Sequence, residues 1–382
     1  MIRSAAPRLH VLDLLRFFAA MFVMGFHLIP IVAFVYGLDA DAYFGHVVAQ
    51  AFRYGWMGVD FFFIISGFVI CMSSWGRSVG DFFTSRATRL MPAYLLAVVM
   101  TSALLTFLWP ASFHPPLAGF LTNLTMVQGM LHVPDIDTVY WTLLVELKFY
   151  LLFAVVVHFG LTYRRVVLFC VSWTVAALVG QYTNNGLIKV LVEPRYAYFF
   201  VAGIVLYLMY RFGPTLLLWG MLAVSWIFCA NSLRLMFSEQ QVPVNLHVGL
   251  GLLTMFLAVM TAAALGKLSW LSWPGFVTIG ALTYPVYLIH FYLSYTILRR
   301  LHGHVPDALL LVCTVATVLL VAYLIHRLVE RRAARLLRAG IRRSFAAIRQ
   351  ADAPQPAEST RPVKAIRVST PTPPAPRTSV AP

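Results

Sequence analysis

Long continuous apolar runs, separated by short polar connections, recur along most of this chain. Each is long enough, or nearly so, to cross about 30 Å of hydrocarbon, and they lack the period-two alternation of barrel strands. Because a chain in lipid must satisfy its backbone hydrogen bonds internally, continuous runs of this kind indicate helices. The pattern predicts an all-α polytopic integral membrane protein, a bundle of about ten helices at residues 11–34, 57–75, 93–111, 138–159, 166–181, 196–210, 214–231, 247–266, 276–298 and 307–326.

Composition extends this picture to the domain organisation. The chain is 60% hydrophobic and 11% charged, whereas soluble domains are nearer 25% charged. We expect one membrane domain, residues 1–340, ending in a juxtamembrane basic helix. Residues 351–382 are rich in Pro, Ala, Ser and Thr and predict a disordered cytoplasmic tail. Any chemistry must then occur inside the bundle or at its mouths.

The net charge of +15 is explained by where the basic residues lie. From Arg327 onward there are 12 Lys and Arg against 3 Asp and Glu, directly after the last predicted span. Basic residues also follow alternate spans: Arg77, Arg86, Arg89, Arg164, Arg165, Arg211 and Lys267. Alternating basic loops predict that both termini are cytoplasmic, and we expect membrane lipids rather than nucleic acid as the partner of this charge.

The first predicted span contains two ionisable residues, Arg16 and His27. A charge at membrane depth costs roughly 2.5–3.5 kcal/mol, so such residues persist mainly where they line a polar cavity or take part in chemistry. Eleven residues at about 100° each return to the same helix face, about 16 Å further along the axis. One face therefore carries a fixed cation towards one side of the membrane and a titratable base towards the other.

Two further motifs lie at the predicted starts of spans. Asp60 lies in GVDFFFIISGF, residues 58–68, where it is either a carboxylate favoured by a helix N-terminus or a residue facing the His27 cavity. Arg86 and Arg89, in RATRLMPAY, share a helix face and can grip phosphate, although ordinary positive-inside residues look the same. Pro92 in this motif suits a first helical turn.

Two motifs place polar residues deep in later spans. Glu146, in YWTLLVELKFYLL, shares a face with Tyr150 and lies at the depth of His27, which predicts a carboxylate–imidazole pair. A structural pair of Glu146 with Lys148 is the alternative. His290 follows Tyr287 in LTYPVYLIH and is either a lone buried histidine or part of the site.

Taken in order, these motifs resemble those of the membrane acyltransferase family 3, over about residues 8–330. Bacterial members O-acetylate lipopolysaccharide O-antigen, exopolysaccharide and peptidoglycan. The resemblance implies that Arg16 and His27 are the essential pair, that Arg86 and Arg89 form the cytoplasmic arginine motif, and that Glu146 is the acid of the fourth span. Many members carry a further basic residue where this chain has Ser85, so donor contacts there are expected to be fewer.

The resemblance implies a stand-alone O-acyltransferase, most simply an O-acetyltransferase, in the bacterial inner membrane. It would move an acyl group from cytoplasmic acyl-CoA, a co-substrate rather than a bound cofactor, to a hydroxyl of a cell-surface glycan or lipid-linked sugar. A pantetheine arm of about 16–20 Å would follow the Arg16–His27 face, measured by the helix rise. His27 would act as general base oriented by Glu146, or carry a transient acyl group.

The remaining predicted residues have binding or structural roles. We expect Arg86, Arg89, Asp60, Tyr150, Tyr287 and His290 to bind substrate. Ser66 is a conceivable nucleophile but fits a helix-packing residue better. The four cysteines have no metal-ligand spacing, so no metal site is predicted. A proton-coupled transporter or flippase using Arg16, His27 and Glu146 is the alternative function, and a non-catalytic scaffold the third.

Overall fold

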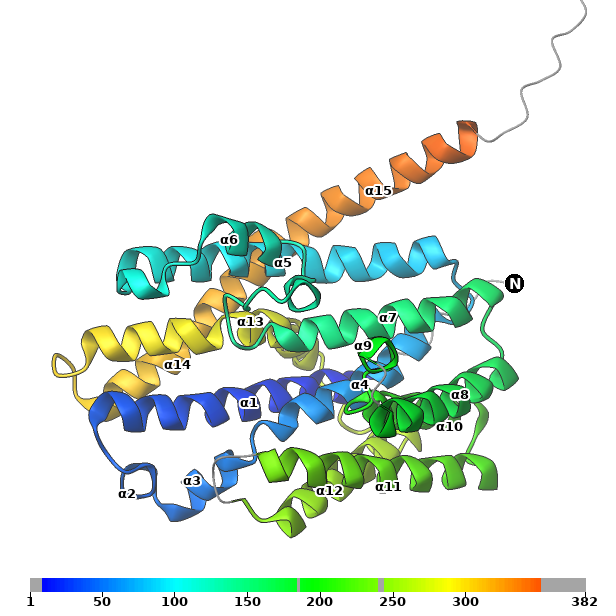
Figure 1. Ribbon diagram of the computed structural model, residues 1–382, viewed down its shortest axis with the longest axis horizontal. Helices are drawn as coiled ribbons and strands as arrows, with labels where there is room; N and C mark the ends of the chain where they lie inside the picture. The colour runs from blue at the N-terminus through cyan, green and yellow to red at the C-terminus, as the bar shows by residue number, and fades with distance from the viewer. Residues whose placement is uncertain (1–8, 184–185, 240–243, 352–382) are drawn as a thin grey trace, which may run out of the picture. The chain divides into compact units, whose positions relative to one another are not determined.

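The computed structural model describes residues 9–183, 186–239 and 244–351 of the chain. In that part of the chain the structure is helical, without a β-strand, and ten helical stretches are long and apolar enough to cross a membrane (Figure 1). They are α1 (His10–Tyr36), α4 (Met57–Ser74), α5 (Val79–Leu108), α7 (Trp141–Phe159), α8 (Tyr163–Tyr182), α9 with α10 (Gly186–Val192 and Ala197–Phe212), α11 (Leu216–Glu239), α12 (Leu246–Ala264), α13 (Gly275–Leu301) and α14 (Asp307–Leu324). This confirms the predicted bundle, one helical stretch for each predicted span.

The C-terminal part of the chain continues from the last span. After α14 a π-helical turn, η3 (Ile325–Glu330), leads into α15 (Arg331–Ala351). Of the described residues, those up to Arg338 belong to one compact unit and those from Ala339 onward to a second. The tail predicted to be disordered lies outside the described residues, except that Ala351 is the last residue of α15.

Helix α5 begins well before the predicted start of its span, at Val79 rather than at residue 93. Ser78 caps this helix, because its hydroxyl oxygen accepts a hydrogen bond from the Asp81 backbone N–H at 3.1 Å. Pro92 therefore lies inside α5 and not in its first turn, which corrects the prediction. The extension places Arg86 and Arg89 on α5, in agreement with the shared helix face expected for them, ahead of the apolar part of the helix.

The core of the bundle is built by helices that are distant in sequence. Helix α1 packs along α13, and α4 packs along α10. At the second of these contacts a Cβ on Gly67 would lie 2.1 Å from the Phe200 backbone oxygen, and one on Gly203 would lie 1.9 Å from that of Ile64. Only glycine permits backbones to approach this closely, as at small-residue interfaces of membrane helices. Helix α4 is thereby held between α1 and α10.

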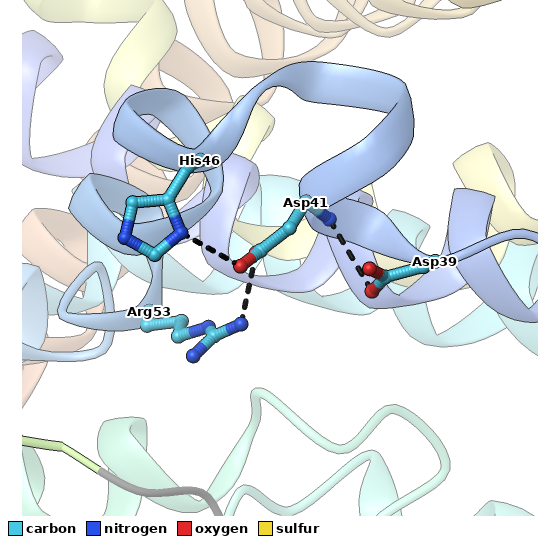
Figure 2. Close-up of polar contacts among 4 residues, drawn as sticks. All are labelled: Asp39, Asp41, His46 and Arg53. Carbon is cyan, nitrogen blue, oxygen red and sulfur yellow. Dashed lines mark hydrogen bonds and ion pairs between the residues drawn. The ribbon is translucent and has the colours of Figure 1, made fainter.

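The two longest connections on the predicted outer side are also ordered. Between α1 and α4 lie α2 (Ala40–Phe44) and α3 (His46–Arg53), joined as Figure 2 shows: Asp41 accepts hydrogen bonds from His46 and Arg53, each at 2.9 Å, and the Asp39 side chain caps α2. Between α5 and α7 lie η1 (Ala111–Phe113), α6 (Leu117–Asn123) and η2 (Gln128–Leu131).

Asn123 ties the second of these connections together. Its side-chain N–H₂ donates to the carbonyl oxygens of Gly119 and Pro134, and its oxygen accepts from the Ile136 backbone N–H. Tyr94 of α5 donates to the Asn123 carbonyl, so the connection is fastened to the bundle. The segment that leads into α7, and with it Glu146, is therefore positioned by buried hydrogen bonds.

Candidate active site

A central cavity lies among α1, α4, α5, α7 and α13. Its polar lining comes from five helices and contains Arg16, Ser66, Arg86, Arg89, Thr142, Glu146, Tyr150, Thr283, Tyr284 and Tyr287. Six of the predicted site residues thus line one cavity: Arg16, Arg86, Arg89, Glu146, Tyr150 and Tyr287. No continuous stretch of sequence contains them, so the bundle itself creates the site.

Glu146 is held at this cavity by two hydroxyl groups. Its Oε1 accepts a hydrogen bond from Ser66 at 2.7 Å and a second from Tyr150, one turn further along α7. Arg16 has Glu146 and Asp13 as its attractive electrostatic neighbours and Arg89 as a repulsive one. Glu146 therefore balances part of the charge of the arginines.

Arg86 is almost fully buried but not fully hydrogen-bonded. Its Nη2 donates to the Ser73 hydroxyl at 2.8 Å, and its guanidinium carbon lies 6.0 Å from the centre of the Tyr150 ring. Its Nε has no hydrogen-bond partner among the described residues. A buried guanidinium with a donor to spare is suited to binding an anion that enters the cavity.

A second cavity, called the outer cavity after the predicted topology, contains His27 and Asp60, together with Trp56, Thr138, Trp141, Arg195, Tyr196 and Glu239. Asp60 is buried in the first turn of α4, and its Oδ2 has no hydrogen-bond partner in the described part of the chain. Asp60 therefore lines the cavity that contains His27, and it also lies in a helical first turn, where the helix N-terminus favours a carboxylate. At the rim Arg195 forms an ion pair with Glu239 at 2.5 Å.

The predicted pairing of His27 with Glu146 is wrong. His27 Nδ1 instead lies 3.0 Å from Nε2 of His290, on α13, while Glu146 contacts Ser66 and Tyr150 in the central cavity. The prediction rested on the similar depth of His27 and Glu146 in the membrane. The direction in which each side chain points depends instead on how the helices pack. Nor does Glu146 pair with Lys148, which forms its ion pair with Glu193.

A series of hydrogen bonds through the two histidines determines which ring nitrogen of each carries the proton. His290 Nδ1 lies 2.8 Å from the Tyr287 carbonyl, which can only accept, so this nitrogen carries the proton. In the neutral ring His290 Nε2 is then an acceptor, and His27 Nδ1 must donate to it. The basic lone pair of His27 is consequently on Nε2. His290 is thus the residue that orients His27.

Tyr287 joins the two cavities. Its side chain lines both of them, as does Val59 of α4. The Tyr287 hydroxyl lies 2.8 Å from that of Thr142 and donates to the Val139 carbonyl at 3.2 Å. Both ionisable residues of α1 face this pair of cavities: Arg16 lines the central one and His27 the outer one, in agreement with the predicted shared face.

A third cavity adjoins the central cavity at its arginines and is called the inner cavity after the predicted topology. It shares Arg16, Arg86, Arg89 and Tyr284 with the central cavity and is also lined by Ser85, His326 and residues of α15. Side chains of η3 and α15 were not predicted as site residues. The basic run was visible in the sequence, but its pattern is equally typical of an ordinary juxtamembrane helix.

Comparison with known protein families decides the assignment. The family model of the acyltransferase domain Acyl_transf_3 matches residues 9–327, most of the chain. The chain belongs to acyltransferase family 3. The searches of curated proteins and of solved structures found no match.

Membership of acyltransferase family 3 confirms the resemblance drawn from the motifs and makes this multi-pass chain a membrane acyltransferase. Every predicted site residue, from Arg16 to His290, lies within the matched region. Helix α15 lies beyond it. Within the described residues no three His, Cys, Asp or Glu side chains gather as metal ligands would.

Proposed function

We propose that this acyltransferase moves an acyl group, most simply acetyl, from acyl-CoA on the cytoplasmic side to a hydroxyl of a cell-surface glycan or lipid-linked sugar. The observation that carries the proposal is the series of three cavities with shared walls. Arginines occupy one end and a histidine base the other. Arg16 and His27 are about 16 Å apart by the helix rise, a distance suited to an extended donor arm.

The donor end fits a phosphate-rich molecule that cannot enter lipid. Arg86 and Arg89 lie where the inner and central cavities meet, and guanidinium groups bind phosphate in bidentate fashion. The central cavity between them and Tyr287 also has apolar walls, from side chains such as Val59, Phe62 and Leu143. It would take the uncharged arm and the thioester.

The acceptor end supplies the proton chemistry. His27 Nε2 takes the proton of the acceptor hydroxyl as its oxygen attacks the thioester carbonyl, and the tetrahedral intermediate then expels the thiolate of coenzyme A. The proton on His27 passes to that thiolate, so the enzyme returns to its starting state. His290 stabilises the imidazolium through the 3.0 Å contact. The same lone pair can instead attack the thioester and expel the coenzyme A thiolate, which leaves an acyl-imidazole. The acceptor hydroxyl then attacks this acyl group, its proton passes to the thiolate, and the imidazole is released.

The outer cavity has groups that would hold a sugar. Asp60 has an unpartnered carboxylate oxygen, and Trp56, Trp141 and Tyr196 supply aromatic faces. Buried polar groups that lack a partner in the empty cavity can bind the hydroxyls of an acceptor. A transporter using Arg16, His27 and Glu146 as a proton relay is less well supported, since Glu146 and His27 are not in contact and the family is one of acyltransferases.

The test uses inverted membrane vesicles, whose cytoplasmic face is outside, supplied with acetyl-CoA labelled in the acetyl group. We expect alkali-labile label in the glycan fraction with the wild-type chain, and a 10²–10⁴-fold lower rate with His27→Ala, the range for a general acid–base group. His158→Ala, an exposed histidine near the end of α7, is the matched control. Equal labelling by His27→Ala and wild type would refute the proposed role.

A further inference from the structure

The inner cavity is more basic than the family's arginine motif alone would make it. Five arginines line it against two carboxylates, Asp13 and Glu330, and one of those, Glu330, is paired with His326 at 2.6 Å. Three of the arginines, Arg16, Arg86 and Arg89, belong to the predicted site. The other two, Arg331 and Arg338, come from α15, beyond the region matched by the family model.

The turn between α14 and α15 determines which side chains face this cavity. Helix α14 is continuous as far as Leu324, and η3 then forms a π-helical turn over Ile325–Glu330. A π-turn adds a residue and rotates the next part of the helix by about 100°, and such turns are frequent at functional sites. Glu330, Ala334 and Arg338, one turn apart, line the cavity with Arg331.

The effect of this turn on charge is large. An uninterrupted α-helix would place the preceding residues, Val329, Ala333 and Leu337, at these positions. This wall of the cavity would then have Glu330 in place of Arg331 and apolar side chains at the other three positions. With the π-turn it carries Arg331 and Arg338 beside Glu330. All four arginines of residues 331–338 are exposed, but Arg332 and Arg335 do not line the cavity.

A buried group within the cavity points to an anionic ligand. Arg86 is 7% exposed and its Nε is without a hydrogen-bond partner in the described residues. Clustered arginines repel one another unless an anion lies among them. A ligand with several phosphates would satisfy both observations.

We propose that Arg331 and Arg338 form a second phosphate subsite, which binds the 3′-phosphate of coenzyme A while Arg86 and Arg89 bind its diphosphate. The subsite rests on the proposed acyl-CoA donor and deepens it. A nucleotide with a 3′-phosphate and a diphosphate esterified at both ends carries about four negative charges near pH 7, of which the 3′-phosphate, a monoester, contributes nearly two. Two arginine pairs at successive depths match such a ligand.

The experiment measures coenzyme A binding to the purified full-length protein in nanodiscs by titration calorimetry. Arg331→Ala with Arg338→Ala should weaken binding about tenfold, since charge-assisted hydrogen bonds from two exposed arginines are lost. Arg332→Ala with Arg335→Ala removes the same charge from the same helix and should leave the Kd within twofold. Pantetheine, which lacks all phosphates, should bind both double variants as it binds the wild type.

Two comparisons are needed. The first distinguishes coenzyme A from lipid headgroups as the ligand of Arg331 and Arg338, and the second distinguishes failure of the subsite from failure of the donor proposal. Nanodiscs of phosphatidylcholine alone and with phosphatidylglycerol should give the same tenfold difference, whereas a difference seen only with phosphatidylglycerol would assign the arginines to lipid headgroups and overturn the subsite. Equal loss in both double variants, or loss in neither, would also overturn it. If the wild type bound no coenzyme A, the donor proposal itself would fall, which the first titration reveals before any variant is compared.

Discussion

The side chain that contacts His27 lies 263 residues away in the chain. The hydrogen bond from His290 Nδ1 to the Tyr287 carbonyl fixes one proton, and through it the tautomer of His27. Sequence motifs had named His27, His290 and Glu146 as site residues but paired the wrong two. The sequence therefore predicted which residues belong to the site, but not which of them contact one another.

We expect His290→Ala to lower acyl transfer less than His27→Ala, because the base remains but loses the group that orients it. The double variant should be no slower than His27→Ala, the non-additivity of residues that act as a unit. His290→Asn, which keeps an acceptor oxygen, should recover part of the lost rate. Initial rates of acyl transfer in inverted vesicles compare these four variants with the wild type. Strictly additive losses would show that the histidines act separately.

A second residue-scale prediction concerns Asp137, in the connection before α7. It is fully buried, and burial raises the pKa of its carboxyl from 3.8 to about 7. Between those values the folded protein keeps a proton that the unfolded chain has lost, so the stability contributed by this group falls as pH rises through that window. The fall is on the order of 1.4 kcal/mol for each pH unit.

Asp137→Asn should abolish this component. Thermal unfolding in detergent at pH 5, 6, 7 and 8 should show a melting temperature that declines towards pH 7 in the wild type and declines less in the variant. Above pH 7 the two curves should run parallel, since the carboxyl is then ionised in both folded and unfolded states. Parallel curves over the whole range would contradict the protonated state inferred from burial.

At the scale of helices, the contact between α4 and α10 depends on two glycines. Gly203→Ala would place a methyl group 1.9 Å from the Ile64 backbone oxygen, and backbone cannot move aside as a side chain can. The helices would separate, and α4 carries Asp60 and Ser66 into the two cavities. We expect a loss of folded protein of several-fold, in line with the 1–3 kcal/mol that overpacking costs.

The control for this change is available in the same bundle. Gly251, on α12, has nothing within 4 Å of its added Cβ, so Gly251→Ala should leave the yield unchanged. Size-exclusion chromatography of the detergent-extracted protein measures the folded fraction of each. A Gly203→Ala chain that extracts as well as Gly251→Ala would mean that α4 and α10 can shift without cost.

For the whole molecule, the prediction that matters most is sidedness, because a donor at one mouth and an acceptor at the other require it. The basic loops predict that the Arg86–Arg89 end is cytoplasmic. Ser85→Cys, in the inner cavity, should react with a membrane-impermeant thiol reagent only in inverted vesicles. Ser112→Cys, exposed in η1, should react in spheroplasts with the native orientation.

Both variants should be made with Cys313→Ser, since Cys313 is the exposed one of the four native cysteines while Cys71, Cys170 and Cys229 are buried. Added coenzyme A should slow labelling at Ser85→Cys and not at Ser112→Cys. Labelling on the opposite sides would invert the topology and place the His27 cavity towards the cytoplasm.

The sequence by itself determined the elements and most of the site's membership. Lipid permits few backbone solutions, so ten apolar runs could only become ten helical stretches, and a charge inside such a run is costly enough to mark function. The family motifs then named residues from Arg16 to His290. The start of α5 was missed because a Ser78 cap among polar residues outweighs the hydropathy pattern.

The tertiary structure alone decided how those residues meet. Whether His27 contacts Glu146 or His290 depends on helix rotation, which is set by close contacts such as Gly67 and Gly203 against backbone oxygens of the neighbouring helix. A single π-turn decided that Arg331 and Arg338, rather than Glu330 and Leu337, occupy their positions in the wall of the inner cavity. Hydropathy records how far along a helix a residue lies, while the direction of its side chain is set by packing with elements distant in sequence.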